Sequence, residues 1–341
     1  MARRERTTGL PRPRVRAEHV KGKRVAGVRW GEQHVRLAII AGAIALLLLV
    51  TGLLGYRYYD NNYATPRHVV LTVGGQKTSL SYYTERLYQF AQANSANQSQ
   101  GSTSLALLEQ QLLTKLEEES LTVQLAKSKG IDLSDDAITK EIATELGVPV
   151  GGPGSSFDTL YRAKLSSTKL SDGNYRRLAE ATLANNALLD QFKSAVGDTG
   201  EGVTLRAVVA ASQGDAQKAL DQIKGGQDMG TVAQTVSTDL TSKQNDGVML
   251  PEAPELLPAN VQTAIKDKPA GADLYGPVQV ETNWWVFRID NRDPAFTYSD
   301  AEKTQLAQAH LDAAIKDERA KTTIKHNLTS DDLTWAVKNA G

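Results

Sequence analysis

The stretch ALDQIKGGQDMGTVAQTVSTD, residues 219–239, decides the fold of the second half of this chain. It begins inside a helix predicted over residues 215–224, which ends at two glycines because glycine readily terminates helices. A second short helix is predicted over residues 228–236. Residues 237–247 are rich in Ser, Thr, Asp and Gly and are therefore predicted to form a loop.

The segments on either side of this stretch complete an α/β unit. Residues 202–211 (GVTLRAVVAA) predict a strand before it, and residues 256–265 predict a helix after it. Residues 276–290 (GPVQVETNWWVFRID) predict one closing strand. This order of strand, two helices, loop, helix and strand resembles a parvulin-type prolyl isomerase domain, which we place at residues 202–293.

The polar residues of a parvulin site are mostly absent from this chain. Parvulins carry one histidine on the first strand and one on the last, and the matching positions here are Ala207 and Trp285. Only the acidic residue of the loop is retained, as Asp239. None of the five histidines falls within residues 201–293. The resemblance implies a substrate pocket formed by Met249, Leu257, Val261 and Trp285.

These replacements predict a degenerate isomerase site. Amide resonance gives the peptide bond a rotation barrier of about 18–20 kcal/mol. An enzyme lowers this barrier with an apolar slot for the proline ring and polar groups around the carbonyl. Asp239 is left without its partners and is open to a second interpretation, as a helix or turn cap. Strand alternation sends Trp284 and Trp285 to opposite faces, one into the core and the other to an exposed, peptide-binding position.

A mainly helical region, residues 65–197, precedes the α/β unit. It opens with the strand VVLTV and a Gly-Gly turn, and long amphipathic helices follow. It resembles the N-terminal domain of the SurA and PrsA family of extracytoplasmic folding factors. The resemblance rests on three stretches: VVLTVGGQKTSLSYY (69–83), LLEQQLLTKLEEESLTVQLAKSKGIDLSDDAITKEI (107–142) and FDTLYRAKLSSTKLSDGNYRRLAEATLANNALLDQF (157–192).

The C-terminal residues are expected to return to this helical region. A long helix is predicted over 299–325, and residues 328–337 carry apolar side chains that need a partner. The resemblance implies that residues 298–341 pack on residues 65–197, so that the parvulin-like part is an insertion. His310 and His326 have no second ligand at metal spacing, and structural roles are expected for both.

The run LAIIAGAIALLLLVTGLLG, residues 37–55, is uncharged and long enough to span roughly 28 Å of hydrocarbon. We predict a transmembrane helix over residues 37–56. A basic arm, residues 1–36, precedes it with eleven Lys or Arg against three acids, which predicts a cytoplasmic N-terminus and extracytoplasmic residues 60–341. A cleaved signal peptide is the alternative.

The composition and the absence of certain motifs argue against several classes of function. Beyond residue 36 the chain has 28 basic and 36 acidic side chains, which argues against nucleic-acid binding by the folded part. The sequence has no cysteine and no Walker, Gly-x-Ser-x-Gly or HExxH motif, so we expect no metal and no cofactor.

We therefore predict an α+β protein: a membrane-anchored, extracytoplasmic folding factor whose helical domain holds unfolded or newly secreted polypeptides in an apolar cleft. Two alternatives remain. One is an active prolyl isomerase that works through Asp239 and the pocket around Met249, Leu257 and Trp285. The other is a scaffolding membrane protein with one fixed partner. The sequence defines neither the clients nor the oligomeric state.

Overall fold

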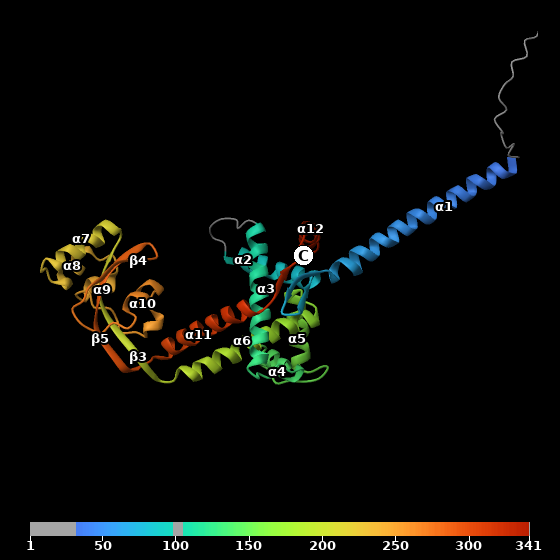
Figure 1. The fold of residues 1–341 in the computed structure, drawn as a ribbon. Helices are drawn as coiled ribbons and strands as arrows, with labels where there is room; N and C mark the ends of the chain where they lie inside the picture. Colours follow the sequence, from blue (N-terminus) through green and yellow to red (C-terminus); the bar gives the residue numbers. More distant parts are fainter. Residues whose placement is uncertain (1–31, 98–104, 341) are drawn as a thin grey trace, which may run out of the picture. The chain divides into compact units, whose positions relative to one another are not determined.

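The computed structural model describes residues 32–97 and 105–340 (Figure 1). The chain divides into two compact units, with the boundary between Tyr63 and Ala64. The predicted basic arm, residues 1–36, lies outside the described residues except for its last five positions.

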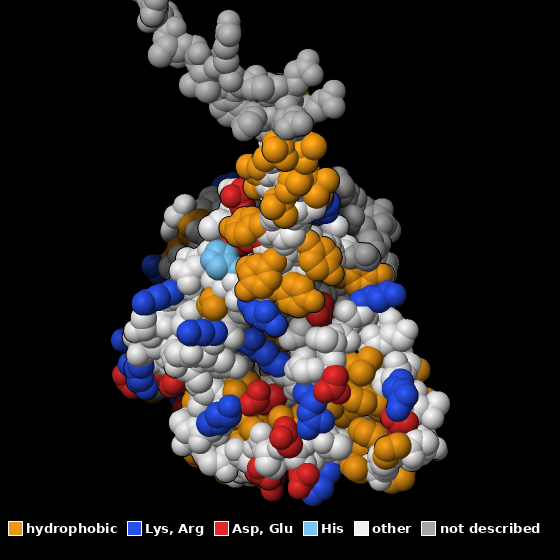
Figure 2. Space-filling model, turned by 90° about the vertical axis from the view of Figure 1, so that its right-hand side faces the viewer, with side chains coloured by type: hydrophobic (Ala, Val, Ile, Leu, Met, Phe, Trp, Pro, Cys, Tyr) orange, Lys and Arg blue, Asp and Glu red, His pale blue; other side chains and the backbone are white. Residues whose placement is uncertain are grey.

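The first unit is built on α1, Glu32–Tyr59, which continues as a turn of π-helix over Asp60–Ala64. The large apolar side chains of α1 from Leu37 to Leu54 are exposed, and Figure 2 shows them as a hydrophobic surface along the helix. In the part of the chain that the structure describes, the helical stretch Ile39–Arg67 alone is long and apolar enough to cross a membrane, with a hydropathy of 2.4.

The helical region of the second unit begins with the antiparallel strands β1, Val69–Val73, and β2, Gln76–Ser79. Their turn needs positive φ angles, 54° at Gly74 and 89° at Gly75, which glycine adopts without strain. Five helices follow: α2 (Leu80–Asn97), α3 (Leu105–Ser128), α4 (Asp135–Glu145), α5 (Ser156–Thr168) and α6 (Asp172–Val196). Ser134 and Ser155 cap α4 and α5 with their side-chain oxygens.

The C-terminal elements complete this helical region. They are α11 (Asp300–Lys321), β6 (Ile324–His326) and α12 (Ser330–Asn339). β6 pairs antiparallel with β1, which gives a three-stranded sheet in the order β2-β1-β6. α12 contacts α2, and Ala336 is buried in the same core as Leu71 and Leu87. The sequence predicted one helix over residues 299–325, which is wrong at its end: pairing with β1 draws residues 324–326 into a strand.

Two histidine–carboxylate contacts fasten this C-terminal segment. His326 Nε2 lies 2.9 Å from Glu117 Oε2 on α3, and Arg319 donates to the other oxygen of the same buried carboxylate at 2.8 Å. His68 Nδ1 lies 2.8 Å from Oδ1 of Asp332, another buried carboxylate. Burial alone would raise the pKa of Asp332, but hydrogen bonds from His68 and Thr329 outweigh burial and lower the pKa below its usual value.

Asp332→Asn is expected to lower the free energy of unfolding by about 1–3 kcal/mol at pH 7, because the charged acceptor of His68 and Thr329 is lost. The depressed pKa stabilises the folded state above the unfolded-state pKa of about 3.9, and this contribution disappears as the pH falls through the lower folded-state value. Urea titrations from pH 7 to pH 2.5 should therefore show the difference shrinking. Asp331→Asn, an exposed neighbour, is the control; equal effects of both variants would contradict the assignment.

The α/β region lies between α6 and α11. Its antiparallel sheet has the order β3-β5-β4, formed by β3 (Thr199–Ala210), β5 (Asn283–Thr297) and β4 (Tyr275–Val280). Its helices are α7 (Gln213–Lys224), α8 (Met229–Val236), α9 (Leu240–Gln244) and α10 (Ala259–Ile265), with a 3₁₀ turn at Pro254–Leu256. Residues of α7 and α8 pack on one face of the sheet and residues of α10 on the other.

Two sequence predictions for this region are wrong. Residues 276–290 form a hairpin and not one strand, because the chain reverses between Val280 and Asn283, with φ 52° at Glu281. The predicted loop over residues 237–247 contains the short helix α9, which Asp239 initiates. Both features are local turns inside segments whose composition does not separate them from a continuous strand or loop.

Candidate functional site

The predicted pocket residues come together on the α10 face of the sheet. Leu257 and Val261 are buried there with Ala207, and Met249 and Trp285 pack against the same cluster while remaining partly exposed. The cross-strand pairs explain this grouping, because Ala207 opposes Phe287 and Trp285 opposes Val209. Ala207 and Trp285, the positions expected from the resemblance to match the parvulin histidines, therefore lie in a continuous apolar cluster.

The tyrosine Tyr275 adds a polar atom to this cluster. Its ring stacks on Phe287 with a centroid separation of 5.6 Å, and its cross-strand partner is the same phenylalanine. The Tyr275 hydroxyl is buried and has no hydrogen-bond partner among the described residues. The structure thus adds a side-chain hydroxyl to the cluster of predicted pocket residues, and Tyr275 was not predicted from the sequence.

Asp239 serves as the cap of α9. Its Oδ1 accepts a hydrogen bond of 2.7 Å from the backbone N–H of Ser242. The backbone of Asp239, just before the first residue of α9, is extended. A buried hydroxyl pair supports this loop: Ser242 Oγ lies 2.9 Å from Ser237 Oγ, which accepts from the backbone N–H of Val209. The geometry thus gives Asp239 the capping role that the sequence allowed as its second interpretation.

The adjacent tryptophans lie on opposite faces, as strand alternation predicts. Trp285 belongs to the α10 face, whereas Trp284 packs beside Val286 and Leu220 on the α7 face. Both side chains are half-buried. Helices cover both sheet faces, so neither tryptophan lies fully in the core and each keeps part of its side chain exposed.

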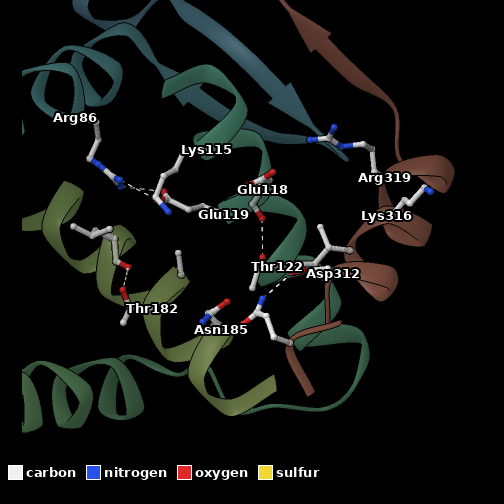
Figure 3. A pocket seen from close by; sticks show the side chains of 14 residues that line it. Arg86, Lys115, Glu118, Glu119, Thr122, Thr182, Asn185, Asp312, Lys316 and Arg319 are labelled. Atoms are coloured by element: carbon white, nitrogen blue, oxygen red, sulfur yellow. Dashed lines mark hydrogen bonds and ion pairs between the residues drawn. The ribbon is translucent and has the colours of Figure 1, made fainter. Parts of the chain in front are cut away.

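A second candidate site lies in the helical region. An open cavity of about 610 Å³ is bordered by α2, α3, α6 and α11 (Figure 3). Its lining includes seven charged side chains: Arg86, Lys115, Glu118, Glu119, Asp312, Lys316 and Arg319. The apolar lining is limited to Leu178, Ala181 and Ile315. The walls of this cavity combine charged, polar and apolar surface, whereas the sequence predicted an apolar cleft in this region.

A buried ion pair fixes one side of the cavity. Arg86 donates to both carboxylate oxygens of Glu119, at 3.0 and 2.8 Å, and also to the hydroxyl of Tyr82 at 2.9 Å. Burial by itself would lower the pKa of Arg86, but Glu119 and Tyr82 outweigh burial and raise the pKa. Arg177 lies over the same Tyr82 ring, with its guanidinium carbon 4.5 Å from the centroid. This arrangement keeps both charges of the Arg86–Glu119 pair in place.

These cavity residues were not predicted from the sequence. The signal was present as charged residues about one turn apart on two long helices, Lys115 and Glu118 on α3 and Asp312 and Lys316 on α11. Such spacing is also typical of an ordinary solvated helix face. Only the packing of α3 beside α11 brings the two pairs to one cavity.

The fold and the site together define a helical domain joined to a small antiparallel α/β domain. Residues 27–189 match the family described as SurA-like N-terminal domain, and residues 186–303 match the PPIC-type PPIase domain. The chain therefore resembles proteins that join a SurA-like N-terminal domain to a PPIC-type domain. The predicted fold class is confirmed by the same matches.

Individual proteins show the same likeness. The chain is 22% identical over 180 residues to foldase protein PrsA 2 of Listeria monocytogenes, which covers 50% of this chain and 61% of that protein. It is 24% identical over 148 residues to foldase protein PrsA 2 of Listeria innocua, covering 43% and 49%. The chain thus spans between about half and three-fifths of the length of these relatives.

Solved structures of PrsA show distant likeness. The crystal structure of the Bacillus anthracis protein is 15% identical, covers 60% of this chain and 96% of its own, and has a TM-score of 0.42. The crystal structure of the Bacillus cereus protein is 14% identical, covers 81% and 99%, and has a TM-score of 0.39.

Proposed function

We propose that this protein is a membrane-anchored, extracytoplasmic folding factor that binds unfolded or newly secreted polypeptides and has lost most prolyl isomerase activity. The match to a SurA-like N-terminal domain followed by a PPIC-type domain supports the binding of polypeptides. The loss of isomerase activity rests on one observation: Ala207 is buried in an apolar cluster and Trp285 packs against it. Ala207 has no polar side-chain atom, and Trp285 has a single indole N–H donor in place of an imidazole that can both donate and accept.

The domain boundaries form part of the proposal. Residues 65–197 and 298–341 would make one helical domain, with the parvulin-like domain, residues 202–293, inserted into it. Pairing of β6 with β1 and the core shared by α2 and α12 support this division. A basic cytoplasmic arm, residues 1–36, and a transmembrane segment, residues 37–56, would precede the helical domain.

Aggregation assays test the polypeptide-binding function. The purified full chain in detergent micelles should suppress the light scattering of a chemically unfolded client at near-stoichiometric ratios, because a folding factor must hold exposed non-native segments. Empty micelles and an unrelated single-span membrane protein are the controls. If the protein suppressed no more aggregation than these controls for several unrelated clients, the chaperone proposal would be wrong. Binding of one native protein alone would favour a scaffolding role.

Protease accessibility tests the topology. Because the cations gather before residue 37, protease added outside intact cells or spheroplasts should digest residues beyond about 60 and leave a short membrane-bound fragment. An N-terminal epitope tag should remain with this fragment. Recovery of the tag-free chain in the soluble fraction would indicate a cleaved signal peptide, and protection of the whole chain would contradict the proposed orientation.

A further inference from the structure

The charged cavity of the helical domain has four charges that are not neutralised by the fold. Arg86 is paired with Glu119, and Arg319 is paired with the buried Glu117. In contrast, Lys115, Glu118, Asp312 and Lys316 form no ion pair with any of the described residues, although all four line the cavity. Asp312 accepts one hydrogen bond, 2.8 Å, from Gln308.

These four charges are arranged as two pairs of opposite sign. Lys115 and Glu118 lie on α3, and Asp312 and Lys316 lie on α11, with the labelled side chains of the two helices bordering the same space in Figure 3. Leu311 of α11 packs with Val123 of α3, whereas Arg319 reaches Glu117, so the two helices run antiparallel along the cavity. Each wall therefore offers a cation and an anion about one helical turn apart.

The neutral polar groups of the cavity suit a polypeptide backbone. Thr122, Thr182, Asn185 and Gln308 also line it, and hydroxyl and amide groups can exchange hydrogen bonds with peptide N–H and C=O groups. The volume of about 610 Å³ lies within the range of about 300–1,000 Å³ that is usual for ligand pockets, so it accommodates a short segment and not a folded domain.

The cost of removing water from the four cavity charges determines which kind of peptide segment binds best. A ligand that fills the cavity removes water from the four charges, and removing water from an unpaired charge is unfavourable. An apolar segment leaves the four charges only the weak attraction between the two opposite charges of each helix. A segment with both acidic and basic side chains replaces the lost water by ion pairs on both walls, each of modest strength because the walls are open to solvent.

We propose that this cavity binds short, extended segments of non-native polypeptides that carry both acidic and basic side chains, in preference to apolar segments. This inference rests on the proposed folding-factor function. Apolar segments of the same clients would bind elsewhere, and the cavity would hold the hydrophilic stretches that flank them.

The test compares a cavity variant with a matched surface variant. The cavity variant, K115Q/E118Q/D312N/K316Q, removes two cations and two anions and leaves the net charge unchanged. The control, D136N/K140Q/D331N/K338Q, does the same at exposed positions on α4 and α12. All eight positions are exposed, so both variants should keep the wild-type far-UV circular dichroism and melting temperature.

The binding measurement uses the full chain in detergent micelles and four fluorescent twelve-residue peptides: Glu/Lys-mixed, all-acidic, all-basic and Leu/Phe-rich. The mixed peptide should bind about tenfold more weakly to the cavity variant than to the wild type or the control, and its wild-type affinity should fall with added salt. Affinity for the Leu/Phe-rich peptide should not change. Equal loss for the Leu/Phe-rich peptide, loss confined to a single-sign peptide, or no loss at all would overturn the proposal.

Aggregation assays on the same variants distinguish the proposal for the cavity from the proposed folding-factor function. If the wild type suppresses aggregation but the cavity variant binds every peptide as tightly as the wild type, the cavity assignment fails and the folding-factor function stands. If the wild type neither suppresses aggregation nor binds any peptide, both proposals fail.

Discussion

Deleting residues 323–341 is expected to lower the free energy of unfolding of the helical domain by several kcal/mol. The deletion removes β6 and α12, and with them the apolar side chains of Ile324, Leu328, Leu333, Trp335 and Ala336 from the core around β1 and α2. It also removes His326 and Asp332, so the buried Glu117 carboxylate loses one partner and His68 loses its carboxylate. Because these side chains are at least partly buried, their loss should lower the free energy of unfolding by on the order of 4 kcal/mol.

Thermal and urea unfolding followed by circular dichroism measure this effect, and point variants provide a finer comparison. Leu333→Ala should destabilise the domain, since Leu333 packs against the core, whereas Val337→Ala on the same helix should have little effect because Val337 is 46% exposed. An unchanged unfolding transition after the deletion would mean that the C-terminal segment is a free tail.

Prolyl isomerase activity on short proline peptides is expected to be about 10⁴-fold below that of an intact parvulin. Positioned polar groups contribute about a hundredfold or more each to such steps, and Ala207 and Trp285 replace two of them. Protease-coupled or NMR exchange measurements on the full chain, with an intact parvulin as the positive control, give the rate. Suppression of client aggregation should persist in the same preparation.

Variants of Asp239 separate catalysis from capping. Asp239→Ala should lower the stability of the α/β domain by about 1 kcal/mol, because the bond to Ser242 N–H is lost, and should not change the residual isomerisation rate. Asp239→Ser can retain the cap and should restore stability. A parvulin-like rate in the wild type that Asp239→Ala abolishes would show that the active-isomerase alternative is right.

The residues of the predicted pocket came from the resemblance to parvulins, and strand periodicity predicts only which residues of one strand share a face. Alternation along β3 and β5 places Ala207, Phe287 and Trp285 on one face, and the helix α10 supplies Leu257 and Val261 to that face. The capping role of Asp239 was open from sequence alone, since Asp in a Ser/Thr-rich loop suits both a cap and a catalytic position.

The charged cavity and β6 could not be predicted in the same way. Whether Lys115 and Lys316 face a common space depends on how α3 packs beside α11, and residues far apart in the chain decide that packing. The strand β6 is three residues long and exists through its pairing with β1, so it has no periodicity of its own to read. Both features are products of tertiary contacts between the beginning and the end of the chain.

The pairing of β1 with β6 has a consequence for the timing of assembly. Leu71 pairs with His326, so a strand formed early in synthesis waits for a partner that emerges about 250 residues later. The α11 wall of the cavity also comes after the whole parvulin-like region. A chain that emerges N-terminus first therefore has no complete cavity until α11 has been synthesised.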